Sequence, residues 1–205
     1  AQWRHLVKGS EDADRIAGVL ALEAAGVAVE TLALDVTDED SVHSYLAERA
    51  TELRPPIRGL IHLATVYDTQ LAAETDKGRF DAAIAAKLNG ARILDRALPD
   101  VDLFVLYSST MTFVPHQGLA AYSAANCGLD ALAADRRAQG KLALSISWGP
   151  WKQLGRAALD YVAKEFEQRG ELSISAEEGD LLLGWLLGGS VSDVSVFRMD
   201  WSTFK

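Results

Sequence analysis

The chain has 205 residues, of which 49% are hydrophobic and 24% are charged, so it is long enough for one domain with a substantial core. Its net charge of −9 argues against nonspecific binding to nucleic acid, and an anionic ligand would need local positive charge. We find no signal peptide and no apolar run near the roughly 18 residues of a membrane helix. The single cysteine, Cys127, excludes an internal disulfide; its alanine-rich surroundings favour packing over reactivity and indicate a reducing cytoplasm.

The first elements can be predicted from caps and apolar runs. Residues 4–7 form a short apolar run that is typical of a strand. Ser10 can cap a helix over residues 11–25, which Gly26 would end. Residues 28–36 then read as a strand that finishes at Asp35.

Strands and long helices alternate along the middle of the chain. Thr37 can cap a further helix, with Asp40 three residues later. The remaining apolar runs predict strands over 57–64, 101–107 and 142–148 and helices over 79–97 and 120–139. This alternation implies right-handed crossovers and predicts an α/β fold, a doubly wound parallel sheet with helices on both faces.

The last third of the chain has a different pattern. Residues 156–169 are amphipathic, a capping box at Ser175 and Glu178 precedes an apolar run over 181–187, and residues 194–199 predict a last strand. Residues 188–190 read as a turn and not as a domain boundary, so we predict a single domain over residues 1–205.

A hydroxyl, a phenol and a carboxamide stand close together in the pattern. Ser109 lies at the end of a predicted strand, and Tyr122 follows it by thirteen residues. Asn126 lies four residues after Tyr122, on the same helix face. A phenol is a poor acid at pH 7, but a nearby cation would make it a better proton donor to a developing alkoxide. Lys87 could supply that cation.

Ser109, Tyr122, Asn126 and Lys87 resemble the tetrad of the short-chain dehydrogenases/reductases. The flanking segments YSSTM, YSAANCGLDALAADRRAQG, SISWGPW and MDWSTF are similar to the ketoreductase domain of modular type I polyketide synthases. The resemblance runs from about Ala28 to the end of the chain. It implies a Rossmann-like fold and reduction, by NADPH, of a β-ketoacyl chain carried on an acyl carrier protein. It also implies a helical lid beside the substrate, which we place over residues 152–190.

The resemblance implies a role for each member of the tetrad. Tyr122 would donate the proton to the carbonyl oxygen, and Ser109 would hold that oxygen by a hydrogen bond. Lys87 would bind the nicotinamide ribose and assist the phenol, and Asn126 would position Lys87 and relay protons. Each residue has an alternative reading, because Lys87 could be a lysine whose stem lies along an apolar stripe and Asn126 could lie on the surface.

Further candidates follow from where ligands bind in this fold, across the carboxyl ends of the strands. Asp35 would contact the adenine, although it could instead simply precede a helix. The residues predicted to contact the cofactor are Asp35, Val36, Ala64, Lys87, Tyr122, Pro150 and Trp151. We predict no metal site.

Three polar residues outside the tetrad have two readings each. We interpret His62 as a satisfied core histidine. His116 could touch substrate or be a solvated loop residue. Asp68 could line the substrate channel or form a turn.

Three functions stay open. The first is an active β-ketoacyl reductase whose partners are an acyl carrier protein and other domains of the same synthase, with neither nucleic acid nor membrane. The second is a catalytically silent scaffold domain of the synthase, and the third is a stand-alone reductase of a small ketone. The intact tetrad favours activity, and the WGPW and MDWSTF segments favour the synthase family.

Two sequence positions bear on the handedness of the hydroxyl group in the product. In the family, a Leu-Asp-Asp motif marks one hydroxyl hand, and here those positions read Tyr67-Asp68-Thr69. A tryptophan eight residues before the tyrosine marks the other hand, and here that position is Val114. Because the Asp motif is incomplete, we favour the L-hydroxy product.

The sequence lacks one expected segment. In this fold a glycine-rich turn between the first strand and helix holds the pyrophosphate, and no GxGxxG motif occurs in these residues. About one βαβ unit's worth of chain, roughly 30 residues, is therefore missing from the pattern. We expect the physical protein to contain it, upstream of Ala1 or near Val7 and Lys8.

Overall fold

The computed structural model describes residues 11–67, 69–152, 160–189 and 191–204, and the chain divides into two compact units, Ala1–Leu34 and Asp35–Lys205. In the first unit, helix α1 (Glu11–Ala24) confirms the prediction over residues 11–25. Gly26 ends the helix with a φ of +84°, a conformation that costs glycine little, and the Val27 amide donates to the Leu22 carbonyl. The predicted cap Ser10 and the predicted strand over residues 4–7 lie outside the described residues.

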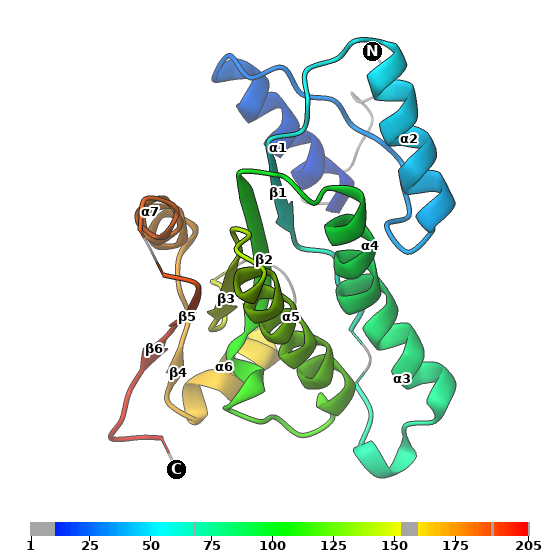
Figure 1. Ribbon diagram of the computed structural model, residues 1–205. Helices are drawn as coiled ribbons and strands as arrows, with labels where there is room; N and C mark the ends of the chain where they lie inside the picture. The colour runs from blue at the N-terminus through cyan, green and yellow to red at the C-terminus, as the bar shows by residue number, and fades with distance from the viewer. Residues whose placement is uncertain (1–10, 68, 153–159, 190, 205) are drawn as a thin grey trace. The chain divides into compact units, whose positions relative to one another are not determined.

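A parallel four-stranded sheet forms the centre of the second unit (Figure 1). Its order is β1 (Gly59–His62), β2 (Leu103–Ser109), β3 (Leu144–Trp148) and β5 (Asp193–Val196). Each pair is parallel, so the carboxyl ends of the strands meet at one edge. The parallel sheet predicted from the alternation of strands and helices is confirmed.

Helices cover both faces of this sheet. Because side chains alternate along a strand, Phe104 and Leu106 of β2 face one way and pack with Ala91 of α4 (Gly90–Ala97) and Leu129 of α5 (Ala120–Ala138). Val105 faces the other way, in a cluster with Leu186 of α7 (Ala176–Leu187) and neighbouring side chains of β3.

The predicted helix over residues 79–97 is built in three parts. Asp76 caps α3 (Lys77–Ile84), and a π-helical turn, η3 (Ala85–Asn89), leads into α4. Helix α2 (Glu39–Thr51) is capped by Asp38 and not, as predicted, by Thr37. Two short 3-10 turns, η2 (Ala72–Glu74) and η4 (Thr110–Thr112), complete the middle of the unit. The π-helical turn was not predicted, because the helical pattern over residues 79–97 contains no proline that marks it.

Two predictions fail here. The strand predicted over residues 28–36 is not formed, because a run of apolar residues becomes a strand only within a hydrogen-bonded ladder and residues 27–35 have no regular structure. Cys127 is exposed and not packed, because the buried face of α5 passes through Tyr122, Asn126 and Leu129 and leaves residue 127 on the other side.

The end of the chain contains a small second sheet. Helix α6 (Asp160–Gln168) precedes β4 (Glu171–Leu172), which pairs antiparallel with β6 (Arg198–Met199). The strand predicted over 194–199 is therefore two strands in two sheets, and the predicted helix over 156–169 lies partly outside the described residues. The capping box of Ser175 and Glu178 is confirmed. No helix in the described ranges is long and apolar enough to span a membrane.

Candidate active site

Three members of the predicted tetrad line one cavity of about 490 Å³ at the carboxyl ends of β2 and β3. They are Lys87, Ser109 and Tyr122. The rest of its wall is mainly apolar and aromatic and comes from the loop after β1, the loop before α5, and α6; it includes Leu63, Tyr67, Met111, His116, Trp148, Pro150, Trp151, Val162 and Phe166. The size and lining are typical of a site for a small organic ligand.

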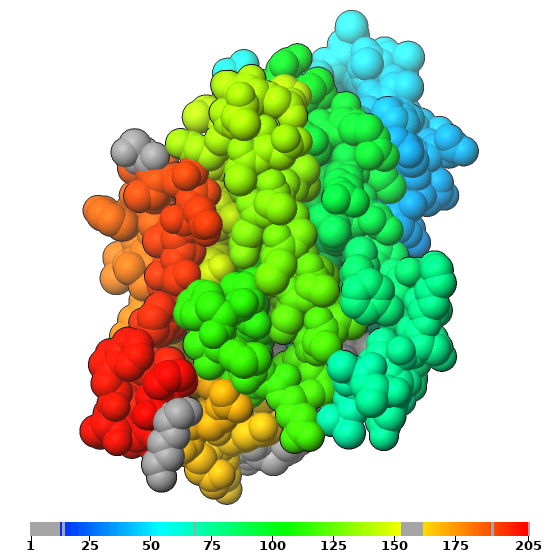
Figure 2. Space-filling model, turned by 60° about the horizontal axis from the view of Figure 1, so that its bottom comes forward, coloured from blue at the N-terminus to red at the C-terminus, as the bar shows by residue number. Residues whose placement is uncertain are grey.

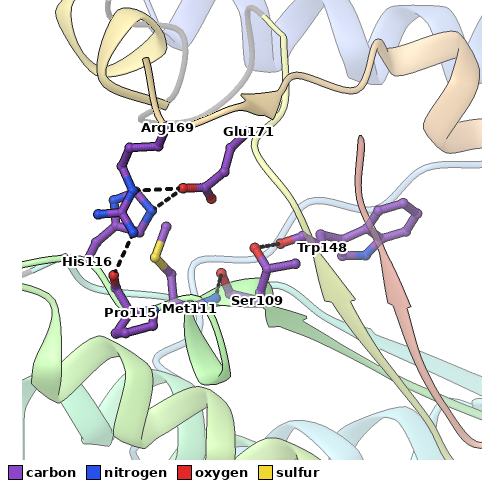
Figure 3. Close-up of polar contacts among 8 residues, drawn as sticks. Ser109, Met111, Pro115, His116, Trp148, Arg169 and Glu171 are labelled. Atoms are coloured by element: carbon purple, nitrogen blue, oxygen red, sulfur yellow. Dashed lines mark hydrogen bonds and ion pairs between the residues drawn. The ribbon is translucent and has the colours of Figure 1, made fainter. Parts of the chain in front are cut away.

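Ser109 is placed by the end of the sheet. It is the last residue of β2, paired in register with Trp148 of β3, and the chain then turns into η4. Its Oγ accepts a hydrogen bond from the Met111 amide at 3.3 Å (Figure 3). That bond leaves the hydroxyl hydrogen available for an oxygen atom in the cavity.

Lys87 is a buried cation beside the phenol ring of Tyr122. It lies in the π-helical turn, only 3% exposed, with Nζ 5.4 Å from the ring centroid of Tyr122. Nζ donates a hydrogen bond to the Tyr107 carbonyl at 2.9 Å. Burial lowers the pKa of Lys87 to about 8. A π-helical turn is frequent at functional sites, and here it lies at the catalytic candidate.

Asn126 lies behind the cavity wall and is fully buried, so its surface alternative is wrong. Its Nδ2 donates a hydrogen bond to the Tyr122 backbone carbonyl at 2.8 Å, and its own backbone carbonyl accepts one from Ser108 Oγ at 3.4 Å. Its Oδ1 is buried with no hydrogen-bond partner among the described residues. It is thus a buried acceptor that a donor near Lys87 could satisfy.

Asp130 extends the same helix face by one more turn and was not predicted. Its Oδ1 accepts a hydrogen bond from Ser145 Oγ at 2.6 Å. Burial raises its pKa, which the hydrogen bonds from Ser145 and Ser108 partly offset. The repeated spacing of four residues from Tyr122 to Asn126 to Asp130 was the signal that could have found it.

The predicted cofactor residues divide into two groups. Pro150 and Trp151 line the cavity beside Lys87 and Tyr122. Asp35, Val36 and Ala64 do not. Asp35 is exposed, and hydrogen bonds from the amide and hydroxyl of Thr37 hold the pKa of its carboxyl below the usual range. Val36 packs against Gly90, where a Cβ would lie 2.7 Å from its side chain, and Ala64 follows β1.

The structure also places two of the three polar residues outside the tetrad, His62 and His116. His62 is a buried core histidine, as predicted, with Nε2 2.8 Å from the Lys87 carbonyl. His116 lines the cavity with a side chain only 5% exposed, so it is not a solvated loop residue. Asp68 lies outside the described residues, and its neighbour Tyr67 stacks on the ring of Tyr122 at 4.9 Å.

A parallel sheet with Ser109, Tyr122 and Lys87 at its carboxyl edge and Asn126 behind them defines the class, the short-chain dehydrogenases/reductases. Within it, the chain belongs to the KR domain family, whose profile matches residues 4–153. It is the ketoreductase type of domain found in modular polyketide synthases.

Similar proteins and structures support this assignment. The chain is 37% identical over 89% of its length to the phenolphthiocerol synthesis polyketide synthase type I Pks15/1 of Mycobacterium marinum. It is 35% identical over 98% of its length to the erythronolide synthase EryA3 of Saccharopolyspora erythraea. It superposes with a TM-score of 0.89 and 34% identity, over 95% of its length, on PlmKR1, a ketoreductase from the first module of phoslactomycin biosynthesis in Streptomyces sp. HK803. It spans 9%, 7% and 45% of these three chains, respectively.

The cavity fits one end of the cofactor that the family implies. Lys87 is the only Lys or Arg among the described residues that line it, and the buried Thr65 Oγ1, also in the wall, has no hydrogen-bond partner within the described part of the chain. A cation, a phenol and an unsatisfied hydroxyl suit the ribose and carboxamide of a nicotinamide nucleotide. A glycine-rich turn for the pyrophosphate is not found in the described ranges.

Proposed function

We propose that this domain reduces a β-ketoacyl group, carried as a thioester on an acyl carrier protein, to the β-hydroxyacyl group during polyketide biosynthesis, with NADPH as cofactor. It would do so in the cytoplasm, beside other domains of the same synthase. The observation that carries the proposal is the convergence of Ser109, Tyr122 and Lys87 on one largely apolar cavity.

The chemistry assigns each side chain a task. NADPH, when bound, supplies a hydride for the ketone carbon. The Tyr122 hydroxyl donates the proton that the carbonyl oxygen gains, and the Ser109 hydroxyl donates a hydrogen bond to that oxygen. Because negative charge develops on the oxygen only as the reaction proceeds, these donors stabilise the transition state more than the bound substrate.

Lys87 and Asn126 support the phenol from behind. The ammonium of Lys87, 5.4 Å from the Tyr122 ring centroid, places positive charge beside the phenol and would hydrogen-bond a ribose hydroxyl. The buried Oδ1 of Asn126 can accept from a donor that passes a proton toward Lys87. The apolar wall formed by Met111, Val162 and Phe166 limits the access of water to these groups.

The proposal is tested by Tyr122→Phe. The fold should stay intact, and reduction of a β-ketoacyl thioester should fall about 10² to 10⁴-fold, because only the proton donor is removed. Tyr45→Phe, in α2, is the matched control and should reduce at the parent rate. If Tyr122→Phe reduces the thioester at nearly the parent rate with saturating NADPH, Tyr122 is not the proton donor.

One observation favours the silent-scaffold alternative. Asp35, Val36 and Ala64 lie outside the cavity, and no described residue forms a phosphate-binding turn. A silent domain would bind NADPH weakly or not at all, which titration of the protein with NADPH decides. A stand-alone reductase would instead bind NADPH and reduce a free small ketone as fast as a carrier-bound thioester.

The product hand is a separate prediction. Because the Asp motif is incomplete at Tyr67-Asp68-Thr69, we expect the L-hydroxyacyl product. Chiral chromatography of the acid released from the reduced thioester measures it. A D-hydroxy product would show that another part of the cavity sets the orientation of the substrate.

A further inference from the structure

A buried histidine of the cavity wall, His116, contacts a buried carboxylate outside the tetrad. His116 Nε2 is 2.7 Å from Glu171 Oε1, and the two side chains are only 5% and 3% exposed. His116 belongs to the loop before α5, and Glu171 belongs to β4, fifty-five residues later in the chain. Burial of a carboxylate is costly unless it is paired, so this contact needs a reason.

Arg169 joins the same two segments. Its Nε is 3.3 Å from Glu171 Oε1, and its Nη2 donates to the Pro115 carbonyl at 3.1 Å. Figure 3 shows the three side chains converging, with Arg169 above His116 and Glu171 beside both. We call His116, Arg169 and Glu171 the clamp.

The β4 side of the clamp is fixed by other contacts. Glu171 pairs with Met199 of β6, and the Gly170 carbonyl accepts from the Asp200 amide at 2.7 Å. Gly170 has a φ of +82°, and a Cβ there would lie 2.6 Å from the Asp200 carbonyl oxygen. Its segment is therefore held close to the end of the chain, and Glu171 is a fixed point for His116 to bind.

The other end of the clamp reaches the reacting groups. The His116 ring packs on Phe166 of α6 with centroids 4.8 Å apart. Phe166 is itself in a buried cluster with Met111 and Tyr122, and all of these line the cavity. Movement of His116 would therefore move the wall formed by α6 beside the Tyr122 phenol.

We propose that the clamp positions α6 against the loop before Tyr122 and so fixes the wall on which the acyl chain of the substrate lies. His116 and Glu171 are positioning residues that act through Phe166 and do not themselves exchange protons with the substrate. The substrate part of this inference rests on the proposed function. Lys87, which we assign to cofactor binding, donates its hydrogen bond to the Tyr107 carbonyl and not to a residue of the clamp.

Two substitutions of His116 separate its ring from its hydrogen bond. His116→Phe keeps a ring against Phe166 but removes the shorter of the two contacts to the Glu171 carboxylate and leaves it Arg169, whereas His116→Gln keeps a donor. For His116→Phe we expect the KM for the acyl thioester to rise and kcat/KM to fall about 10-fold or more. His116→Gln should restore most of that loss, and the Kd for NADPH should stay unchanged in both.

His43→Phe is the matched control, because His43 forms an exposed pair with Glu39 in α2, with the two side chains 56% and 45% exposed. It should leave KM, kcat and Kd unchanged. The double variant His116→Phe with Glu171→Leu also removes the buried carboxylate that has lost its hydrogen bond to His116, and it should recover part of the loss. Equal effects of His43→Phe and His116→Phe, or a loss confined to NADPH binding, would overturn the proposal.

A second measurement needs no activity. Amide hydrogen exchange should become faster in α6 in His116→Phe, while α2 stays at the parent rate. Unchanged exchange in α6 would overturn the clamp even if the parent protein reduces thioesters. If the parent reduces no thioester while α6 still loosens in His116→Phe, the proposed function fails and the clamp stands.

Discussion

At the scale of single residues, Lys87 is a cation whose burial in the site carries an electrostatic cost. It is almost fully buried, it donates a hydrogen bond to the Tyr107 carbonyl, and burial lowers its pKa from 10.5 to about 8. Burial of a cation is unfavourable for folding. Lys87 also lies in a π-helical turn, a feature that is rare in helices and frequent at functional sites. Both features are typical of a residue with a catalytic or binding role.

The lowered pKa predicts a pH dependence of the reaction. Below about pH 8 the ammonium of Lys87 is protonated and can assist Tyr122, so kcat/KM should fall as the pH rises through about 8. In Lys87→Arg the guanidinium stays charged, so this decline should disappear even though the rate is lower. A pH–rate profile of both proteins measures it, and an unchanged decline in Lys87→Arg would assign it to another group.

The same pKa predicts an effect on stability. Because the folded pKa lies below the unfolded value, the penalty is fully present below about pH 8, and stability rises with pH between about 8 and 10.5. Lys87→Met should therefore stabilise the fold at pH 7, by up to the order of 3 kcal/mol, and much less at pH 10. Urea unfolding at the two pH values tests this. A destabilised Lys87→Met at pH 7 would show that the hydrogen bond to Tyr107 outweighs desolvation.

The spacing together with the family resemblance predicted that the four tetrad residues lie close together, but not what lies around them. Ser109, Tyr122 and Asn126 are local in sequence and sit on a strand end and one helix face, so a short window identified them. The clamp joins residues fifty-five apart through a two-residue strand, and no local pattern encodes that contact. The placement of Asp35 outside the cavity likewise depends on chain packing and not on its neighbours in the sequence.

At the scale of elements, periodicity predicted α5, β2 and β3 well, because long apolar repeats and completely buried strands leave clear patterns. The prediction of a strand over residues 28–36 was wrong. Its apolar residues indicate burial, but a sequence pattern does not show whether a neighbouring strand is available for pairing. The β4–β6 pair was missed because two-residue strands have no periodicity.

Helix α7 offers a test of element packing with its own control. A Cβ at Gly179 would lie 2.2 Å from the rigid ring of Trp151, which lines the cavity, whereas Gly184 in the same helix has no atom within 4 Å. Gly179→Ala should destabilise the fold by about 1–3 kcal/mol through overpacking. Gly184→Ala should stabilise it by about 0.5–1 kcal/mol through helix propensity. Denaturant unfolding compares them, and equal effects would contradict this packing.

At the scale of the whole molecule, the chain concentrates its chemistry at one edge of one sheet. The net charge is −9, and the described lining of the cavity holds Lys87 together with Glu165 and Asp180, so Lys87 is the lysine or arginine there that an anionic cofactor could contact. The chain spans less than half of the similar solved ketoreductase PlmKR1 and a tenth or less of the two curated synthases named above.

One measurement tests the central claim most directly. The protein, NADPH and a β-ketoacyl chain on its acyl carrier protein are incubated together, and the released chain is weighed by mass spectrometry. We predict a gain of two hydrogen atoms that requires NADPH and is lost in Tyr122→Phe. A folded protein that binds NADPH but leaves the ketone unreduced, or one that reduces it equally well as Tyr122→Phe, would contradict the account.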